Sequence, residues 1–136
     1  MTSQHQTIRF VNPPSLPRPA GYSHVAQVSN GNTIYISGQV ALDQSGTLVG
    51  QNDLRTQTHQ VFAHLKAALE AVGADFNCVV KLNYYLLDIS QIQIVREVRD
   101  QFVNPERPPA SSAVEVRRLI RDGLLIEIDA VAVIPA

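Results

Sequence analysis

Two carboxylates near the C-terminus are spaced as side chains on one face of a β-strand. Glu127 and Asp129 lie in the apolar run 124–134, and alternation places them opposite Ile126 and Ile128. A carboxylate among aliphatic residues in a half-buried strand is costly to ionise unless it has partners. Two interpretations stay open: a solvated strand face, or a pocket carboxylate that orients water or moves a proton.

Other reactive residue types form no recognisable site. His59 and His64 are five residues apart and so do not share a helical face as a metal-binding i,i+4 pair would. The sequence contains neither GxGxxG nor GxxxxGK, the glycine-rich loops that bind phosphate. Cys78 precedes a predicted apolar strand, which is typical of a buried, inert thiol. We therefore expect no metal and no cofactor.

Composition limits the classes of protein that remain. The 136 residues are 45% hydrophobic and 17% charged with a net charge of -1, which indicates one globular domain, 1–136, and argues against nucleic-acid binding. A single cysteine and an N-terminus unlike a signal peptide favour a cytoplasmic protein that does not span a membrane. Because charges are few for so small a domain, we expect apolar surface to be covered by further copies of the chain.

The chain pattern near the N-terminus predicts a strand, a stiff arm and a hairpin. Residues 8–11 alternate as a strand does, and four prolines in 12–21 exclude a helix from the segment that follows. Asn30 and Gly31 stand between the β-prone runs 24–28 and 33–40, and Asn-Gly is a strong hairpin signal. We therefore expect these two runs to pair with each other.

The remaining pattern predicts an α+β fold. Apolar residues at helical spacing follow Asn52 or Asp53 and stop at Gly73. A second helix follows Asp88 or Ser90 and is expected to end at Pro105, Pro108 and Pro109. Further strands are expected at 79–87, 113–116 and 124–134. The simplest closure is one mixed sheet with two helices on one face, which leaves the other face open for partner subunits.

Four segments together resemble the RidA/YjgF family of reactive-intermediate deaminase-like proteins. They are Gly21-Tyr22-Ser23, the run 36–40, the run 109–116 and the run 126–133, in the order and spacing of that family. The resemblance implies a chorismate-mutase-like fold and a homotrimer with sites in clefts between subunits. In the best-known branch, the activity is hydrolysis of enamines and imines to ketoacids and ammonia without a cofactor.

The resemblance also implies roles for individual residues. Tyr22 corresponds to the tyrosine that lines the cleft, Ser37 with the Gly38 backbone to its floor, and Glu127 to the glutamate that holds the attacking water. The match favours the functional interpretation of Glu127. Ser111, Ser112 and Ala113 occupy the segment that contacts substrate.

Three of these positions depart from the deaminating branch. That branch has arginine at position 111, cysteine at 113 and asparagine at 96, where this chain has Ser111, Ala113 and Arg96. Serine has neither the charge nor the two-pronged geometry of a guanidinium. Loss of a hydrogen bond to a charged group costs about 1.5–3 kcal/mol. We expect a changed substrate, with Arg96 either binding its anionic group or lying on the helix surface.

Three functions remain open. The leading hypothesis is a small-molecule hydrolase of the enamine/imine deaminase type, with Glu127 and Ser37 catalytic. The alternative is a non-catalytic protein that binds a small carboxylic acid or another small metabolite in the same cleft, as the departures suggest. The third, an endoribonuclease or translation inhibitor, is opposed by the near-neutral charge.

Overall fold

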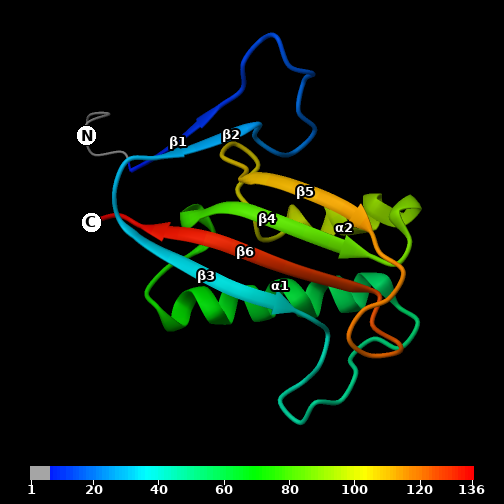
Figure 1. Ribbon diagram of the computed structural model, residues 1–136. Coiled ribbons are helices and arrows are strands. Elements are labelled where there is room, and N and C mark those ends of the chain that lie inside the picture. Colours follow the sequence, from blue (N-terminus) through cyan, green and yellow to red (C-terminus); the bar gives the residue numbers. More distant parts are fainter. Residues whose placement is uncertain (1–6) are drawn as a thin grey trace.

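The computed structural model describes residues 7–136 and has the α+β architecture expected from the sequence (Figure 1). Residues 1–6, where we expect no signal peptide, lie outside this range. The main sheet has the order β3-β6-β4-β5, and only the β4–β5 pair is parallel. Its strands are β3 (Asn32–Gln39), β4 (Val79–Leu86), β5 (Ala110–Glu115) and β6 (Ile126–Ile134). Helices α1 (Leu54–Ala71) and α2 (Ile92–Arg99) cover one face of this sheet.

The first helix begins and ends at the residues that the sequence indicated. The Asp53 carboxylate accepts hydrogen bonds from the backbone N–H of Thr56 at 3.1 Å and from its hydroxyl at 2.7 Å. Such an N-cap satisfies a backbone donor that the helix itself leaves unpaired. Gly73, with a φ of 77°, follows the last turn in the left-handed conformation that glycine adopts without strain.

The second helix begins later than expected. Asp88 caps the short 3-10 helix η3 (Ile89–Gln91), and α2 follows directly without a side-chain cap of its own. The helix then ends at Arg99, well before the prolines that were expected to end it. Arg96 and Arg99 therefore occupy its last turn, where cations interact favourably with the unpaired helix carbonyls.

The predicted hairpin is wrong. Strand β2 (Val25–Val28) pairs with β1 (Ile8–Val11) in a separate two-stranded sheet, whereas β3 pairs with β6. A two-residue Asn-Gly turn needs a positive φ at both positions, but among the described non-glycine residues only Asn52 has one. Of the two turn residues only Gly31 has a positive φ, 123°, and its close approach to the carbonyl of Ile134 leaves no space for a side chain. The chain thus passes from one sheet to the other.

Alternation along the central strands separates a buried face from an uncovered one. Leu82 and Tyr84 of β4 and Ile128 of β6 are buried beneath the helices. Tyr85 and Glu127, their neighbours in sequence, lie on the face that neither helix covers. Within residues 7–136, no helix has the length and apolar character needed to cross a membrane.

Candidate functional site

A β-bulge in β3 gives Glu127 its place. Ile36 pairs with Ala130 and Gln39 with Ile128, so β3 has one extra residue there. The extra length falls at Ser37 and Gly38. A Cβ atom on Gly38 would overlap Oε2 of Glu127, so the absence of a side chain lets the carboxylate lie against the strand. The structure therefore brings together Gly38 and Glu127, with the exposed Ser37 next in the chain.

The two carboxylates of β6 have different surroundings. Asp129 accepts hydrogen bonds from Nδ2 of Asn83 at 2.7 Å and from the hydroxyl of Tyr85 at 3.0 Å. Burial, and then the negative charge of Asp129, raise the pKa of Glu127 above its usual value, and no hydrogen bond from the described residues opposes the shift. Asp129 is thus held by two hydrogen-bond donors, whereas Glu127 accepts no hydrogen bond from the described residues.

The Glu127 face is open to solvent in one subunit. An open depression of about 300 Å³ is lined by Tyr85, Glu127 and Asp129 together with the segment after β5. Large apolar side chains stand on or near this face, with Ile120 83% and Tyr35 81% exposed. An isolated subunit therefore leaves the carboxyl at the edge of an uncovered, partly apolar surface.

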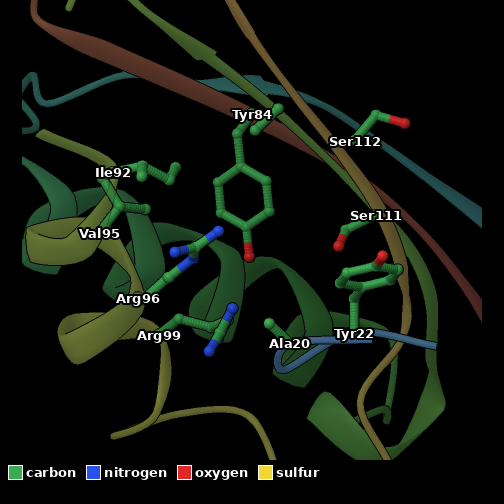
Figure 2. Close-up of a pocket in the computed structure, with 10 residues that line it drawn as sticks. Ala20, Tyr22, Tyr84, Ile92, Val95, Arg96, Arg99, Ser111 and Ser112 are labelled. Atoms are coloured by element: carbon green, nitrogen blue, oxygen red, sulfur yellow. The ribbon is translucent and has the colours of Figure 1, made fainter. Parts of the chain in front are cut away.

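A second, more enclosed cavity lies between α2 and the edge strand β5 (Figure 2). Its volume is about 190 Å³, and Figure 2 shows the polar ends of Tyr84, Arg96 and Ser111 turned toward its interior. The residues that line it are Ala20, Tyr22, Tyr84, Ile92, Val95, Arg96, Arg99, Ser111, Ser112 and Ala113. Five of the residues expected to bind substrate, Tyr22, Arg96, Ser111, Ser112 and Ala113, therefore line one cavity.

The proline-rich arm supplies one wall of this cavity. The backbone N–H of Ser23 donates to the carbonyl of Pro109 at 3.1 Å, and its hydroxyl donates to that of Pro108 at 2.6 Å. These bonds dock the arm beside β5 and place Tyr22 at the cavity. Ser112 contributes less, because its hydroxyl accepts a hydrogen bond from Nζ of Lys81 at 3.2 Å and points away from the cavity (Figure 2).

Two polar residues of the cavity, Tyr84 and Arg99, were not among the expected site residues. The hydroxyl of Tyr84 points into the cavity (Figure 2), and the residue is only 5% exposed. Because burial raises the pKa of this phenol, it stays protonated. Arg99 pairs through Nε and Nη2 with Asp100, both at 3.0 Å, and lies against Gly21. The sequence feature that could have indicated Arg99 as a site residue is its place as an arginine within the apolar stripe of a helix. For Tyr84, the signal was a phenol on the buried face of its strand.

The expected site is therefore divided within one subunit. Tyr84 is paired in register with Ile128 and Tyr85 with Glu127, so the cavity and the carboxylate lie on opposite faces of the same sheet. The structure brings Glu127 to Gly38, and Tyr22 to Arg96 and Ser111, but it does not bring these two groups together. Residues 7–136 contain no cluster of three histidine, cysteine, aspartate or glutamate side chains arranged to hold a metal ion.

Comparison with known proteins identifies relatives over almost the whole chain. The family model described as endoribonuclease L-PSP matches residues 15–134. A RutC family protein of Synechocystis is 35% identical over 130 residues, which are 95% of this chain and 98% of that protein. A 2-iminobutanoate/2-iminopropanoate deaminase of Dermatophagoides farinae is 32% identical over 127 residues, which are 93% and 96% of the two chains.

A solved structure has the same fold. A conserved Rid-family protein of unknown function from Yersinia pestis superposes with a TM-score of 0.84 at 36% identity, over 95% of this chain and 100% of that one. The fold described above is thus a known protein architecture.

Proposed function

Because the chain belongs to the endoribonuclease L-PSP family, also called RidA/YjgF, we propose that it hydrolyses enamines or imines of small acids in clefts between its subunits. The observation that carries this proposal is the position of Glu127, whose carboxyl lies against the Gly38 backbone. Its pKa is raised, and none of the described residues donates a hydrogen bond that would lower the pKa again. A relative named as a 2-iminobutanoate/2-iminopropanoate deaminase supports the same class of reaction.

Glu127 acts as the base toward water in this proposal. Its carboxylate takes a proton as the water oxygen attacks the imine carbon, and it returns that proton to the substrate nitrogen as the C=N bond becomes single. Collapse of that adduct forms the C=O bond and releases ammonia, so one water is consumed per imine. A raised pKa suits a carboxyl that first accepts this proton and then returns it. The Ser37 hydroxyl and the Gly38 N–H stabilise developing charge on the substrate.

The two halves of the site meet only between subunits. The carboxylate and the cavity are on opposite faces of one sheet, so the uncovered face of one subunit has to approach the cavity of another. The exposed Tyr35 and Ile120 support such packing, because apolar side chains this exposed gain by being covered. We propose the homotrimer of the family, which sedimentation analysis will distinguish from a monomer.

The altered wall of the cavity points to an altered substrate. Ser111 offers a hydroxyl where the deaminating branch has a guanidinium, while Arg96 extends into the same cavity from α2 (Figure 2). A guanidinium that approaches from the helix rather than from β5 places an anion differently. We therefore propose that the chain accepts small acids other than those best suited to the common arrangement.

The test is hydrolysis of imines produced in solution. An amino-acid oxidase acting on a panel of amino acids that includes 2-aminobutanoate supplies the imines, and semicarbazide traps whatever imine is not hydrolysed. We expect the protein to lower the trapped fraction and Glu127→Gln to reduce the rate about 100-fold or more. Glu70→Gln, which removes an exposed acid from α1, is the matched control. An unchanged rate in Glu127→Gln would show that the mechanism is wrong.

The second candidate function is binding without turnover. It is favoured by one observation, that the cavity lies entirely on one side of the sheet and includes no part of Glu127. Thermal shifts with small acids that persist in Glu127→Gln, without imine hydrolysis by the wild-type protein, would identify this function. A separate measurement of RNA binding at low salt tests the ribonuclease role, which the net charge of -1 opposes.

A further inference from the structure

The cavity between α2 and β5 carries positive charge without an opposing charge on its wall. Arg96 and Arg99 are its only charged lining residues, and no aspartate or glutamate lines it. Asp100, outside the lining, pairs with Arg99 and offsets that charge. None of the ion pairs found in residues 7–136 includes Arg96. The net attraction for an anion therefore comes from Arg96, with Arg99 held in a fixed orientation by its pair.

A buried hydroxyl gives the cavity a second, independent feature. Tyr84 is 5% exposed, and its oxygen is the only buried side-chain polar atom of the described residues that has no hydrogen-bond partner. A buried hydroxyl without a partner destabilises a fold, so such groups are nearly always paired. The Tyr84 hydroxyl points toward the space between Arg96, Arg99 and Ser111 (Figure 2). A ligand that accepts hydrogen bonds there supplies the missing partner.

We propose that Tyr84 and Arg96, with Arg99 beside them, form a subsite for the carboxylate of a small organic acid. A carboxylate accepts up to four hydrogen bonds, so it can be bound by the phenol and a guanidinium at once. Ile92, Val95 and Ala113 line the rest of the cavity and suit a short aliphatic chain. Its 190 Å³ is ample for such an acid, since one water needs only roughly 10–15 Å³ of space of this kind.

The subsite assigns the residues that bind the anion of the substrate in the proposed hydrolase. If the carboxylate is bound inside one subunit, the imine carbon faces the cavity mouth, where Glu127 of a neighbouring subunit approaches. The substrate is then a short 2-imino acid whose anion is bound from α2 and β4 rather than from position 111. This assignment to a substrate rests on the proposed function, whereas the binding of an anion does not.

A purely structural explanation covers only part of the arrangement. Arg96 and Arg99 stand in the last turn of α2, where positive charge stabilises the helix end without any ligand. That role does not require a phenol at Tyr84, because phenylalanine would fill the same space without a buried hydroxyl. The two explanations therefore predict different effects of Tyr84→Phe.

Calorimetric titration with 2-oxobutanoate, the product expected from 2-iminobutanoate, tests the subsite. We expect 2-oxobutanoate to bind at least 10-fold more tightly than 2-oxobutanamide, its uncharged counterpart. Tyr84→Phe and Arg96→Gln should each weaken 2-oxobutanoate binding roughly 10–100-fold, as for loss of a hydrogen bond to a charged group. Arg55→Gln, which removes the same charge from the surface of α1, should bind as the wild type does.

Thermal melting separates loss of the subsite from loss of the fold. Removing an unpaired buried hydroxyl leaves the melting temperature of free Tyr84→Phe unchanged or raises it, so weaker binding by a more stable protein supports the subsite. Failure of the wild type to bind 2-oxobutanoate, or wild-type affinity in both variants, would overturn it.

Turnover assays on the same variants keep the two proposals distinct. Binding that depends on Tyr84 without any imine hydrolysis would retain the subsite and reject the hydrolase. Hydrolysis with unchanged kcat and KM in Tyr84→Phe and Arg96→Gln would retain the hydrolase and reject the subsite.

Discussion

The two faces of the central sheet carry opposite chemistry. On the uncovered face, Glu127 and Asp129 form a half-exposed acidic pair beside the bulge at Gly38. On the helix face, Arg96 and the phenol of Tyr84 point into an enclosed cavity that has no acidic lining residue. A strand whose successive residues point to opposite sides keeps these groups apart within one subunit. In the proposed function, activation of water and binding of an anion are thereby separated until subunits meet.

The degree of burial differs between the two faces for a physical reason. A carboxylate that changes its protonation state needs some contact with solvent, since full burial would keep it neutral. An anion receptor gains from enclosure, because hydrogen bonds and charge interactions strengthen as water is removed. Glu127 is partly exposed to solvent, whereas Tyr84 is enclosed. Variants that affect one face and leave the other intact therefore test the comparison.

The largest expected effect is that of Gly38→Ala on turnover. The new Cβ overlaps the end of the Glu127 side chain, which has to turn away from the bulge, and hydrolysis should fall about 100-fold, as for Glu127→Gln. The fold should tolerate the change, because the overlapping atoms belong to a flexible side chain and Gly38 does not have a positive φ. Affinity for 2-oxobutanoate should stay at the wild-type value.

Gln44→Ala, at an exposed position of the turn that follows β3, is the control for this variant. Equal hydrolysis by Gly38→Ala and the wild type would mean that the contact between the bulge and the carboxylate has no catalytic role. Loss of 2-oxobutanoate binding in Gly38→Ala would show that the two faces are not independent.

The acidic face could be predicted from sequence because its information is local. Strict alternation in 124–134 was sufficient to place Glu127 and Asp129 on one side, and Asp53 and Gly73 marked the ends of α1. The hydrogen bonds of Asp129 to Asn83 and Tyr85 could not be predicted, since they depend on how β4 and β6 are aligned. Register between distant strands is set by packing, which no single segment encodes.

The cavity and the hairpin show where local signals fail. Asn30-Gly31 has the residues of a tight turn, but β1 and β6 compete for the strands on either side of it and form the pairs that are observed. The role of Tyr84 was likewise hidden, because its strand, the arm at Tyr22 and the last turn of α2 come from separate parts of the chain. Only the folded arrangement shows that a phenol on the buried face lacks a partner.

A smaller effect is expected from exchanging the position of the cation. Arg96→Asn should weaken 2-oxobutanoate binding roughly 10–100-fold, and adding Ser111→Arg in that background should restore most of the loss. The reason is that positions 96 and 111 line the same cavity, so a guanidinium from β5 can replace one from α2. Calorimetry on the wild type, the single variants and the double variant measures the coupling. Additive effects of the two substitutions would mean that they do not serve one anion.

The smallest expected effect concerns the stability of the acidic face. Because the folded protein raises the pKa of Glu127, the unfolded chain gives up this proton at lower pH than the folded one does. Stability from this group therefore falls as pH rises from the unfolded pKa through the folded pKa, and the full penalty is present above the folded pKa. Glu127→Gln should remove that penalty and melt slightly higher than the wild type, although solvent screening keeps the gain below about 0.5 kcal/mol. The gain should vanish at a pH below both pKa values, and Glu70→Gln should show none.

A Glu127→Gln variant that is less stable than the wild type at about pH 7 would mean that the carboxylate is held by favourable contacts, and the contrast between the two faces would then be wrong.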